Sequence, residues 1–223
     1  MKIVVVIPAF DEAPRIAAVV RGVIRAGFRD VIVVDDGSRD DTTLEAAEAG
    51  ARVVLHPINC GAGAAVKTGL ELALRLGADA AVMLDADGQH DPAEIGAVLA
   101  PVQAGKADLS LGVRLKDRGT MPAITRLFNL AGNLVTFFLS GIWVKDSQSG
   151  FRALSKAAMT LMEVEGSGFE FCTEMIMEAA RLGLRIEQVP IRTIYTEAAR
   201  GKGQNYSTGL KTVFKLLVRS LMR

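Results

Sequence analysis

The chain has 223 residues, of which 50% are hydrophobic, and it carries 26 Lys and Arg against 25 Asp and Glu. This length is enough for one sizeable α/β domain, or for a domain with an appendage, and the hydrophobic content is enough for a packed core. The near-zero net charge argues against a nucleic-acid-binding protein, which usually carries a basic excess. The two cysteines, Cys60 and Cys172, fit neither a metal-binding spacing nor a disulfide framework, and they suggest a reducing compartment.

In the first half of the chain, apolar runs typical of buried parallel strands alternate with segments of helical periodicity. We expect strands at residues 2–7, 30–34, 52–55, 79–84 and 107–113, and helices at residues 13–26, 42–49, 63–76 and 92–103. Asp11 and Asp91 are expected to cap the first and last of these helices. This alternation is typical of a doubly wound, mostly parallel sheet, in which ligands bind outside the carboxyl ends of the strands.

The second half of the chain is less regular. We expect a long apolar helix at residues 122–141, a short strand or turn at 148–154, a helix at 174–182, one or two strands within 185–194, and a final helix at 208–222. The short apolar N-terminus is expected to be a strand, because it is too short for a signal peptide and charged residues follow at once. We expect no membrane-spanning helix, because polar residues interrupt the longest apolar stretch.

The most informative motif is Asp85-Ala86-Asp87, followed by Gly88-Gln89-His90, directly after the strand at 79–84. Two carboxylates one residue apart at the end of a strand can share Mg²⁺ or Mn²⁺, which often takes substrate phosphates as further ligands. The alternative is a polar turn that merely ends the strand. Three other polar clusters, at residues 11–12, 35–38 and 59–63, are expected at the same edge of the sheet, and this convergence favours a single site.

The glycine-rich segment at residues 61–66 follows a strand and opens a helix, which leaves three interpretations open. It could bind a dinucleotide, it could be a tight turn, or it could lie against a nucleotide with Lys67 as a phosphate contact. The first is disfavoured, because the first strand–helix turn, at residues 8–12, has no glycine. At residues 35–38, carboxylates could accept hydrogen bonds from a base or ribose, while Ser38 or Asp40 could cap the next helix.

Five motifs, in this order along the chain, carry a resemblance to a known family. They are Ile7-Pro8-Ala9-Phe10-Asp11-Glu12, Val33-Val34-Asp35-Asp36-Gly37-Ser38, Asn59-Cys60-Gly61-Ala62-Gly63, Asp85-Ala86-Asp87-Gly88-Gln89-His90 and Gln148-Ser149-Gly150-Phe151-Arg152. Over residues 1–195 the chain resembles family 2 glycosyltransferases, especially the dolichol-phosphate mannose synthases and polyprenyl-phosphate glucosyltransferases. The resemblance implies a GT-A fold, which is Rossmann-like, with helices on both faces of a mostly parallel sheet. We expect a catalytic domain at residues 1–207 and a basic amphipathic helix at 208–223.

The resemblance also implies roles for individual residues in binding the nucleotide-sugar. The positions that the resemblance implies in donor binding are Pro8, Ala9, Glu12, Asp36, Asp85, Ala86 and Asp87. Among them, the first three would line the base and ribose pocket, and Asp36 would contact the nucleoside. The interpretation of the glycine-rich segment as a nucleotide contact adds Gly63 and Lys67. Asp85, Asp87 and Gln89 would hold Mg²⁺ or Mn²⁺.

The basic residues implied at the phosphates are spread along the chain. Arg114 matches a position near the donor and acceptor phosphates, while Arg126 and Arg152 match positions on the acceptor side; with Asp87 they form the expected catalytic set. Arg200 and Lys202 lie where the family places a mobile basic segment over the phosphates. The histidines His56 and His90 are expected to be turn residues. Glu170 and Glu174 could serve as a general base toward a hydroxyl acceptor, but a structural role is favoured for both.

The implied reaction is an inverting transfer of mannose or glucose, from GDP-mannose or UDP-glucose, to a polyprenyl phosphate. An acceptor phosphate is already an anion at neutral pH and needs no strong general base, which fits a site rich in arginine. Two alternatives stay open: a family member that acts on a saccharide or another non-lipid acceptor, and a non-catalytic nucleotide-sugar-binding protein.

The end of the chain is strongly basic, with no Asp or Glu after Glu197. The helix expected at 208–223 has an apolar face and a basic face, which suits the surface of an anionic membrane. The apolar helix at 122–141 could lie beside it. The alternative for both is packing on the protein's own core or on a partner. We therefore expect a cytoplasmic protein, peripheral at the inner face of the membrane; the resemblance also allows a membrane-anchoring subunit or a homodimer.

Overall fold

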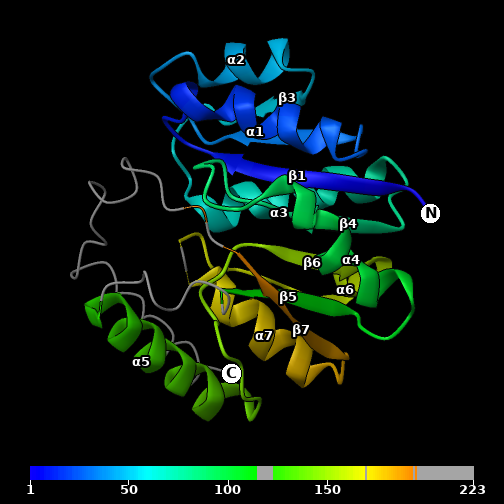
Figure 1. Cartoon of the computed structure of the whole chain (residues 1–223), viewed down its shortest axis with the longest axis vertical. Helices are drawn as coiled ribbons and strands as arrows, with labels where there is room; N and C mark the ends of the chain where they lie inside the picture. Colours follow the sequence, from blue (N-terminus) through cyan, green and yellow to red (C-terminus); the bar gives the residue numbers. More distant parts are fainter. Residues whose placement is uncertain (115–122, 169, 193, 195–223) are drawn as a thin grey trace.

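The structure is a computed structural model that describes residues 1–114, 123–168, 170–192 and 194; the side chains of 123–128 are outside the description. Strands and helices alternate along most of it (Figure 1). In chain order the elements are β1 (Ile3–Ala9), α1 (Ala13–Arg25), β2 (Val31–Asp35), α2 (Thr42–Glu48), β3 (Arg52–Leu55), α3 (Ala62–Arg75), β4 (Ala80–Met83), the 3₁₀ turn η1 (Pro92–Glu94), α4 (Ile95–Gln103), β5 (Leu109–Arg114), α5 (Ala123–Ser140), β6 (Arg152–Ser155), α6 (Lys156–Leu161), α7 (Phe171–Arg181) and β7 (Ile186–Ile191).

The strands form one seven-stranded sheet in the order β3-β2-β1-β4-β6-β5-β7. Among these described strands only β6 runs antiparallel to its neighbours, and β1, β2, β3, β4, β5 and β7 all point the same way. Their carboxyl ends therefore meet at one edge, on the side of the molecule where α5 projects (Figure 1). This edge is where a doubly wound sheet binds its ligands.

Helices cover both faces of the sheet, because side chains alternate along each buried strand. Val5 and Ile7 of β1 pack with α1, α2 and α4, whereas Val4 and Val6 pack with α3, α6 and α7. The prediction of a mostly parallel α/β sheet with helices on both faces is confirmed.

Most expected elements are present with ends that differ by one to three residues. Asp91 caps η1 as expected, since its carboxylate accepts a hydrogen bond from the Ala93 amide at 2.9 Å. The expected cap at Asp11 is wrong: Glu12 is the N-cap of α1, and Asp11 has a left-handed φ of 53°. The Asp11 carboxylate instead accepts from the Arg39 amide at 2.9 Å. The short helix α6, capped by Ser155, was not predicted.

Helix α5 packs on α7 and extends beyond the sheet edge (Figure 1). In the described part of the chain, no helix combines the length and the apolar character that crossing a membrane requires. The final helix expected at 208–222, and the division of the chain at residue 207, lie outside the described residues.

Candidate active site

The carboxyl edge of the sheet is held together by backbone hydrogen bonds between adjacent strand ends. The amide of Asp36, just after β2, donates to the carbonyl of Ala9 at the end of β1 (2.8 Å). The amide of Leu84, just after β4, donates to Val6 of β1 (3.1 Å). The segments that follow β1, β2 and β4 therefore start side by side. The half-buried Pro8 and the buried Ala9 form the last part of β1 at this edge.

Asp85 and Asp87 lie in the turn that follows β4, and each is fixed by the protein. The Oδ2 atom of Asp85 is 3.0 Å from Nε2 of His90. The Oδ1 atom of Asp87 accepts a hydrogen bond from the Gln89 amide at 2.9 Å. Behind Asp85 the backbone of Gly150 lies so close that a Cβ there would be 2.7 Å from the Asp85 Cγ and Oδ2 atoms.

The two carboxyl groups have opposite pKa shifts. Burial tends to raise the pKa of Asp85, but the hydrogen bond and charge of His90, with the charge of Arg114, hold that pKa below its ordinary value. Burial, and then the negative charge of Asp85, raise the pKa of Asp87. A pair of carboxylates that repel each other, with only oxygen donors, suits a hard divalent cation. The residues present therefore fit Mg²⁺ or Mn²⁺.

His90 is more than the turn residue that the sequence suggests. Its side chain is only 4% exposed, and its ring packs 5.2 Å from the ring of Phe151. Since Nε2 contacts Asp85, the histidine fixes one of the two carboxylates from the protein side. Its position five residues after Asp85 was visible in the sequence, but nothing there showed that the chain turns back.

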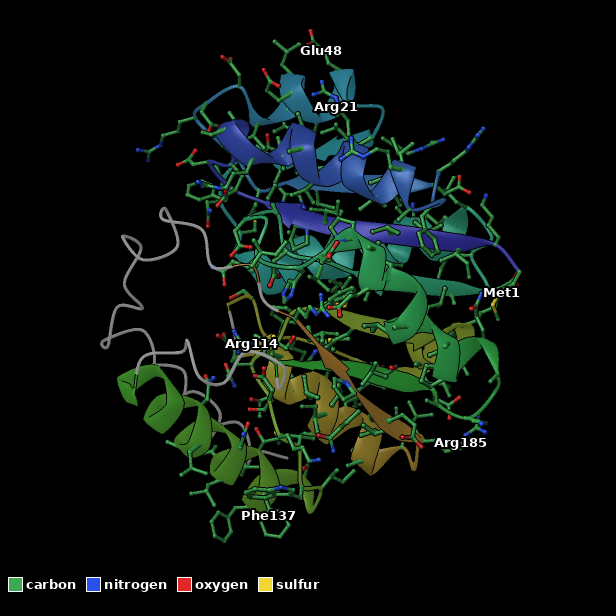
Figure 2. All side chains as sticks on the ribbon, in the orientation of Figure 1. Met1, Arg21, Glu48, Arg114, Phe137 and Arg185 are labelled. Atoms are coloured by element: carbon green, nitrogen blue, oxygen red, sulfur yellow. The ribbon has the colours of Figure 1, made fainter. Side chains whose placement is uncertain are left out.

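Arg114 ends β5 at the same edge, where Figure 2 shows it on the side that faces α5. Its Nε and Nη2 atoms donate to the two carboxylate oxygens of Asp146, at 2.6 and 2.8 Å, and its amide donates to Asp146 at 3.2 Å. Asp146 is 4% exposed. Burial tends to raise its pKa, but Arg114 outweighs that effect and lowers the pKa. Asp146 was missed in the sequence because it lies far along the chain from Arg114.

The Asp35-Asp36 pair serves mainly to hold loops. Asp36 is buried, and its carboxylate accepts from His56 Nδ1 (2.7 Å) and from the amides of Cys60 (2.9 Å) and Gly61 (2.7 Å). Asp35 accepts from the Ser38 amide at 2.9 Å and from the Thr43 hydroxyl. The nucleoside contact expected of Asp36 stays a prediction, and its internal bonds give it a second task. His56 helps to hold the glycine-rich loop.

The glycine-rich loop packs against protein. The amide of Gly63 donates to the carbonyl of Ser167 at 2.8 Å, and a Cβ on Gly63 would collide with the Gly166 carbonyl. Lys67, one turn further along α3, is exposed and borders a groove of about 390 Å³ between α3 and α6. The donor contacts expected of Gly63 and Lys67 stay predictions.

Comparisons with known proteins identify the family of this chain. Residues 4–159 match the family described as Glycosyl transferase family 2. The chain belongs to this family. It is similar to an uncharacterized protein, MJ1222, of Methanocaldococcus jannaschii (37% identity over 99% of this chain and 93% of the relative). It is also similar to the UDP-N-acetylglucosamine–dolichyl-phosphate N-acetylglucosaminyltransferase of Methanococcus voltae (35% identity over 97% of this chain and 95% of the relative). A third relative is the undecaprenyl-phosphate mannosyltransferase of Micrococcus luteus (31% identity over 91% of this chain and 87% of the relative).

A solved structure shares the fold of this glycosyltransferase. Glucosyl-3-phosphoglycerate synthase from Mycobacterium tuberculosis, crystallised with Mn²⁺, UDP-glucose and phosphoglyceric acid, matches with a TM-score of 0.78. The identity is 23%, and the match covers 98% of this chain and 79% of that chain. The expected GT-A fold is thereby confirmed, and the protein is a glycosyltransferase.

The role expected of Arg152 in this glycosyltransferase is not met in the structure. Its side chain is fully buried, and its guanidinium donates to the carbonyls of Ser149 (3.0 Å), Cys172 (2.6 Å) and Ser147 (2.8 Å). An arginine committed to three backbone carbonyls inside the protein does not face an acceptor phosphate. It fixes the segment at 147–149, which lies next to Asp146.

The remaining expected site residues divide by where they lie. Glu12 is buried next to β1 and pairs with Arg15. Ala86, between the two aspartates in the sequence, is buried in the core. Arg126 is in the first turn of α5, but its side chain is outside the described residues, as are Arg200 and Lys202 altogether.

Proposed function

We propose that this glycosyltransferase transfers a hexose, mannose or glucose, from a nucleoside diphosphate sugar to a polyprenyl phosphate with inversion at the anomeric carbon. The observation that carries the proposal is that one sheet edge holds both the carboxylates of Asp85 and Asp87 and the ion pair of the partly buried Arg114 with the buried Asp146. A site that joins two phosphorylated substrates needs both a cation site and a fixed arginine. The names of the relatives from Methanococcus voltae and Micrococcus luteus support a lipid phosphate as the acceptor.

The proposal assigns the metal to the turn after β4. Asp85 and Asp87, with Gln89, would hold Mg²⁺ or Mn²⁺. When bound, the cation supplies Lewis-acid stabilisation of the negative charge that builds up on the leaving diphosphate. His90 and Gly150 keep Asp85 in place from behind, one through a hydrogen bond and the other through close packing.

The acceptor phosphate is assigned to Arg114, with Arg126 on α5 as its expected second contact. Arginine keeps its charge at all relevant pH values and binds phosphate through a planar fork. Asp146 binds one side of the guanidinium through Nε and Nη2, so the end that carries Nη1 is the part proposed to meet the phosphate, in an orientation that is already fixed. Arg152 has no place in this scheme except as a support for the segment that carries Asp146.

The acceptor oxygen attacks the anomeric carbon in a single displacement, which inverts the configuration. A phosphate monoester is already ionised near neutral pH, because its second pKa is about 6, so no side chain needs to remove a proton. Glu174 has a structural role instead of acting as a general base. Its carboxylate accepts a hydrogen bond from the Gly166 amide (2.6 Å) and so holds the loop that packs on Gly63.

We assign the donor nucleoside to a site at the carboxyl ends of β1 and β2. Pro8, Ala9 and Glu12 would line it, and Asp36 would hold its glycine-rich wall as well as contacting the nucleoside. Ala86, Gly63 and Lys67 complete the expected donor side, and Arg200 and Lys202 are proposed to cover the phosphates.

We further propose that the protein works at the cytoplasmic, inner face of the membrane as a peripheral protein, with the segment at 208–223 as one contact. The requirement for a lipid acceptor and the basic end of the chain support this. A membrane-anchoring subunit or a homodimer would be compatible with it.

Calorimetry of donor binding tests the site before any acceptor is chosen. GDP-mannose, UDP-glucose and UDP-N-acetylglucosamine would be titrated into the protein with Mn²⁺, and again with EDTA. One donor should bind only with metal, and Asp87→Asn should lose that binding while its circular dichroism stays unchanged. Equal donor binding with EDTA, or by the variant, would contradict the metal assignment.

A further inference from the structure

Helix α5 places polar side chains toward the protein and apolar ones toward solvent. Asn133 and Thr136 are buried on its inner face. Asn133 donates to the Lys145 carbonyl (2.9 Å) and accepts from the Ser147 amide (2.8 Å), while the Thr136 hydroxyl lies 3.3 Å from that of Thr173 on α7. An ordinary surface helix has the reverse arrangement, with its apolar stripe on the core.

The outer face of α5 and the turn that follows it carry a cluster of large apolar side chains, which we call the outer patch. The outer patch consists of Leu130, Leu134, Phe137, Phe138 and Trp143, which are 48%, 40%, 38%, 79% and 48% exposed. The first four are spaced at i, i+4, i+7 and i+8, which places them on one side of the helix. The ring of Phe137 lies 5.9 Å from that of Phe138 and 5.8 Å from that of Trp143. Figure 2 shows Phe137 on the outer end of α5.

The charges around the outer patch indicate what covers it. From residue 123 to residue 145 the sequence contains no Asp or Glu, and its charged residues are Arg126 and Lys145. Lys145 is exposed two residues beyond Trp143. Aromatic side chains next to basic ones suit the boundary between lipid headgroups and acyl chains of an anionic membrane. A helix with one apolar side can lie in this boundary, with its axis in the plane of the membrane.

We propose that the outer patch of α5 inserts into the surface layer of an anionic membrane. Arg114 lies at the sheet edge on the side from which α5 projects (Figure 2), so α5 and the edge proposed to bind the acceptor phosphate are on the same side of the molecule. The inference rests on the proposed function in that a lipid acceptor gives the contact its purpose. A lipid acceptor alone would not show which surface of the protein touches the membrane.

Trp143 makes the insertion directly measurable, because it is the single tryptophan of the chain. The full-length protein is mixed with phosphatidylglycerol vesicles that contain no polyprenyl phosphate. We expect the protein to float with the vesicles, the Trp143 emission to shift to the blue, and bromine-labelled acyl chains to quench it. The double variant Leu134→Ser, Phe138→Ser should bind the vesicles at least about tenfold more weakly, because both apolar side chains leave water on insertion.

The matched control is the double variant Leu44→Ser, Leu55→Ser. These leucines are 54% and 59% exposed, on α2 and β3, away from α5. The control should bind vesicles like the unchanged protein. Both double variants should keep their transfer activity toward a polyprenyl phosphate dissolved in detergent.

Each other outcome has a defined meaning. Unquenched Trp143 in vesicle-bound protein would overturn the inference, because another segment would then make the contact. So would a stable dimer that only the α5 variant dissociates, because a second copy would then cover the outer patch. Sugar transfer in detergent without vesicle binding would remove this inference alone. Quenched Trp143 with no transfer to any lipid would support the inference while the proposed function fails.

Discussion

Replacing Gly150 by alanine would test whether the position of Asp85 determines metal binding. The added Cβ would collide with Asp85 Oδ1 and lie 2.7 Å from Asp85 Cγ, whereas two carbon atoms in contact prefer about 3.5 Å or more. The carboxylate must therefore move by roughly 1 Å. Since Mg²⁺ binds oxygen within a narrow range near ~2.1 Å, a shift of this size would weaken the proposed coordination of a metal by Asp85.

We expect Gly150→Ala to weaken Mn²⁺ binding about 10- to 100-fold and to lower kcat by about 10²-fold. The fold should lose about 1–3 kcal/mol from the overpacking, which leaves the protein folded at room temperature. Mn²⁺ affinity would be measured by electron paramagnetic resonance, alongside thermal unfolding. The matched control is Gly96→Ala in α4, where nothing lies within 4 Å of an added Cβ, and it should bind Mn²⁺ normally. Unchanged Mn²⁺ affinity in Gly150→Ala would refute the reasoning.

Three further changes have distinct expected outcomes. Burial and the charge of Asp85 raise the pKa of Asp87, so ionisation of Asp87 lowers the stability of the metal-free protein as the pH rises through that raised pKa. Asp87→Asn should therefore raise the Tm of the metal-free protein at pH 7 and abolish the increase in Tm that Mn²⁺ causes. Calorimetric melts from pH 4 to 8 would measure both effects. Asp146→Asn should lower the free energy of unfolding by about 3–5 kcal/mol, because Arg114 loses its buried, charged partner. The lowered pKa of Asp146 stabilises the fold above the pKa of the unfolded state, and that stability is lost as the pH falls through the pKa of the folded state. The variant should therefore lose less stability at low pH, and urea melts at pH 3–7 would test this. Arg152→Lys should lower stability by about 1–3 kcal/mol in urea melts, because backbone carbonyls lose donors, with little change in the KM for the acceptor; a large rise in that KM would restore the phosphate-binding role.

The sheet and its functional edge could be predicted because their signals are local. An apolar run such as Val4–Ile7 predicts a buried strand, and Asp85 and Asp87 follow directly after a second apolar run. Alternation of strand and helix then fixes which strand ends share an edge. What the sequence could not show is β6 running antiparallel between β4 and β5, since that pairing joins segments about seventy residues apart.

The assignments that needed correction depend on partners that are distant in the sequence. Arg152 looks like a phosphate ligand until the carbonyls around it are seen, and no pattern in the sequence places Cys172 beside it. Asp146 was overlooked for the same reason, because only the fold brings it to Arg114. Asp11 looked like a helix cap by composition alone, but its backbone turns into the left-handed region and Glu12 takes that position.

Transfer of radiolabelled sugar into a lipid tests the central proposal most directly. Purified protein would be incubated with a polyprenyl phosphate in detergent, Mn²⁺, and labelled GDP-mannose, UDP-glucose or UDP-N-acetylglucosamine in parallel, and the organic phase would be counted. We predict labelled lipid from one hexose donor, GDP-mannose or UDP-glucose, and its loss with EDTA and with Asp87→Asn. Label from UDP-N-acetylglucosamine alone would keep the lipid acceptor but correct the sugar. Metal-dependent donor binding with no labelled lipid from any donor would contradict the lipid acceptor.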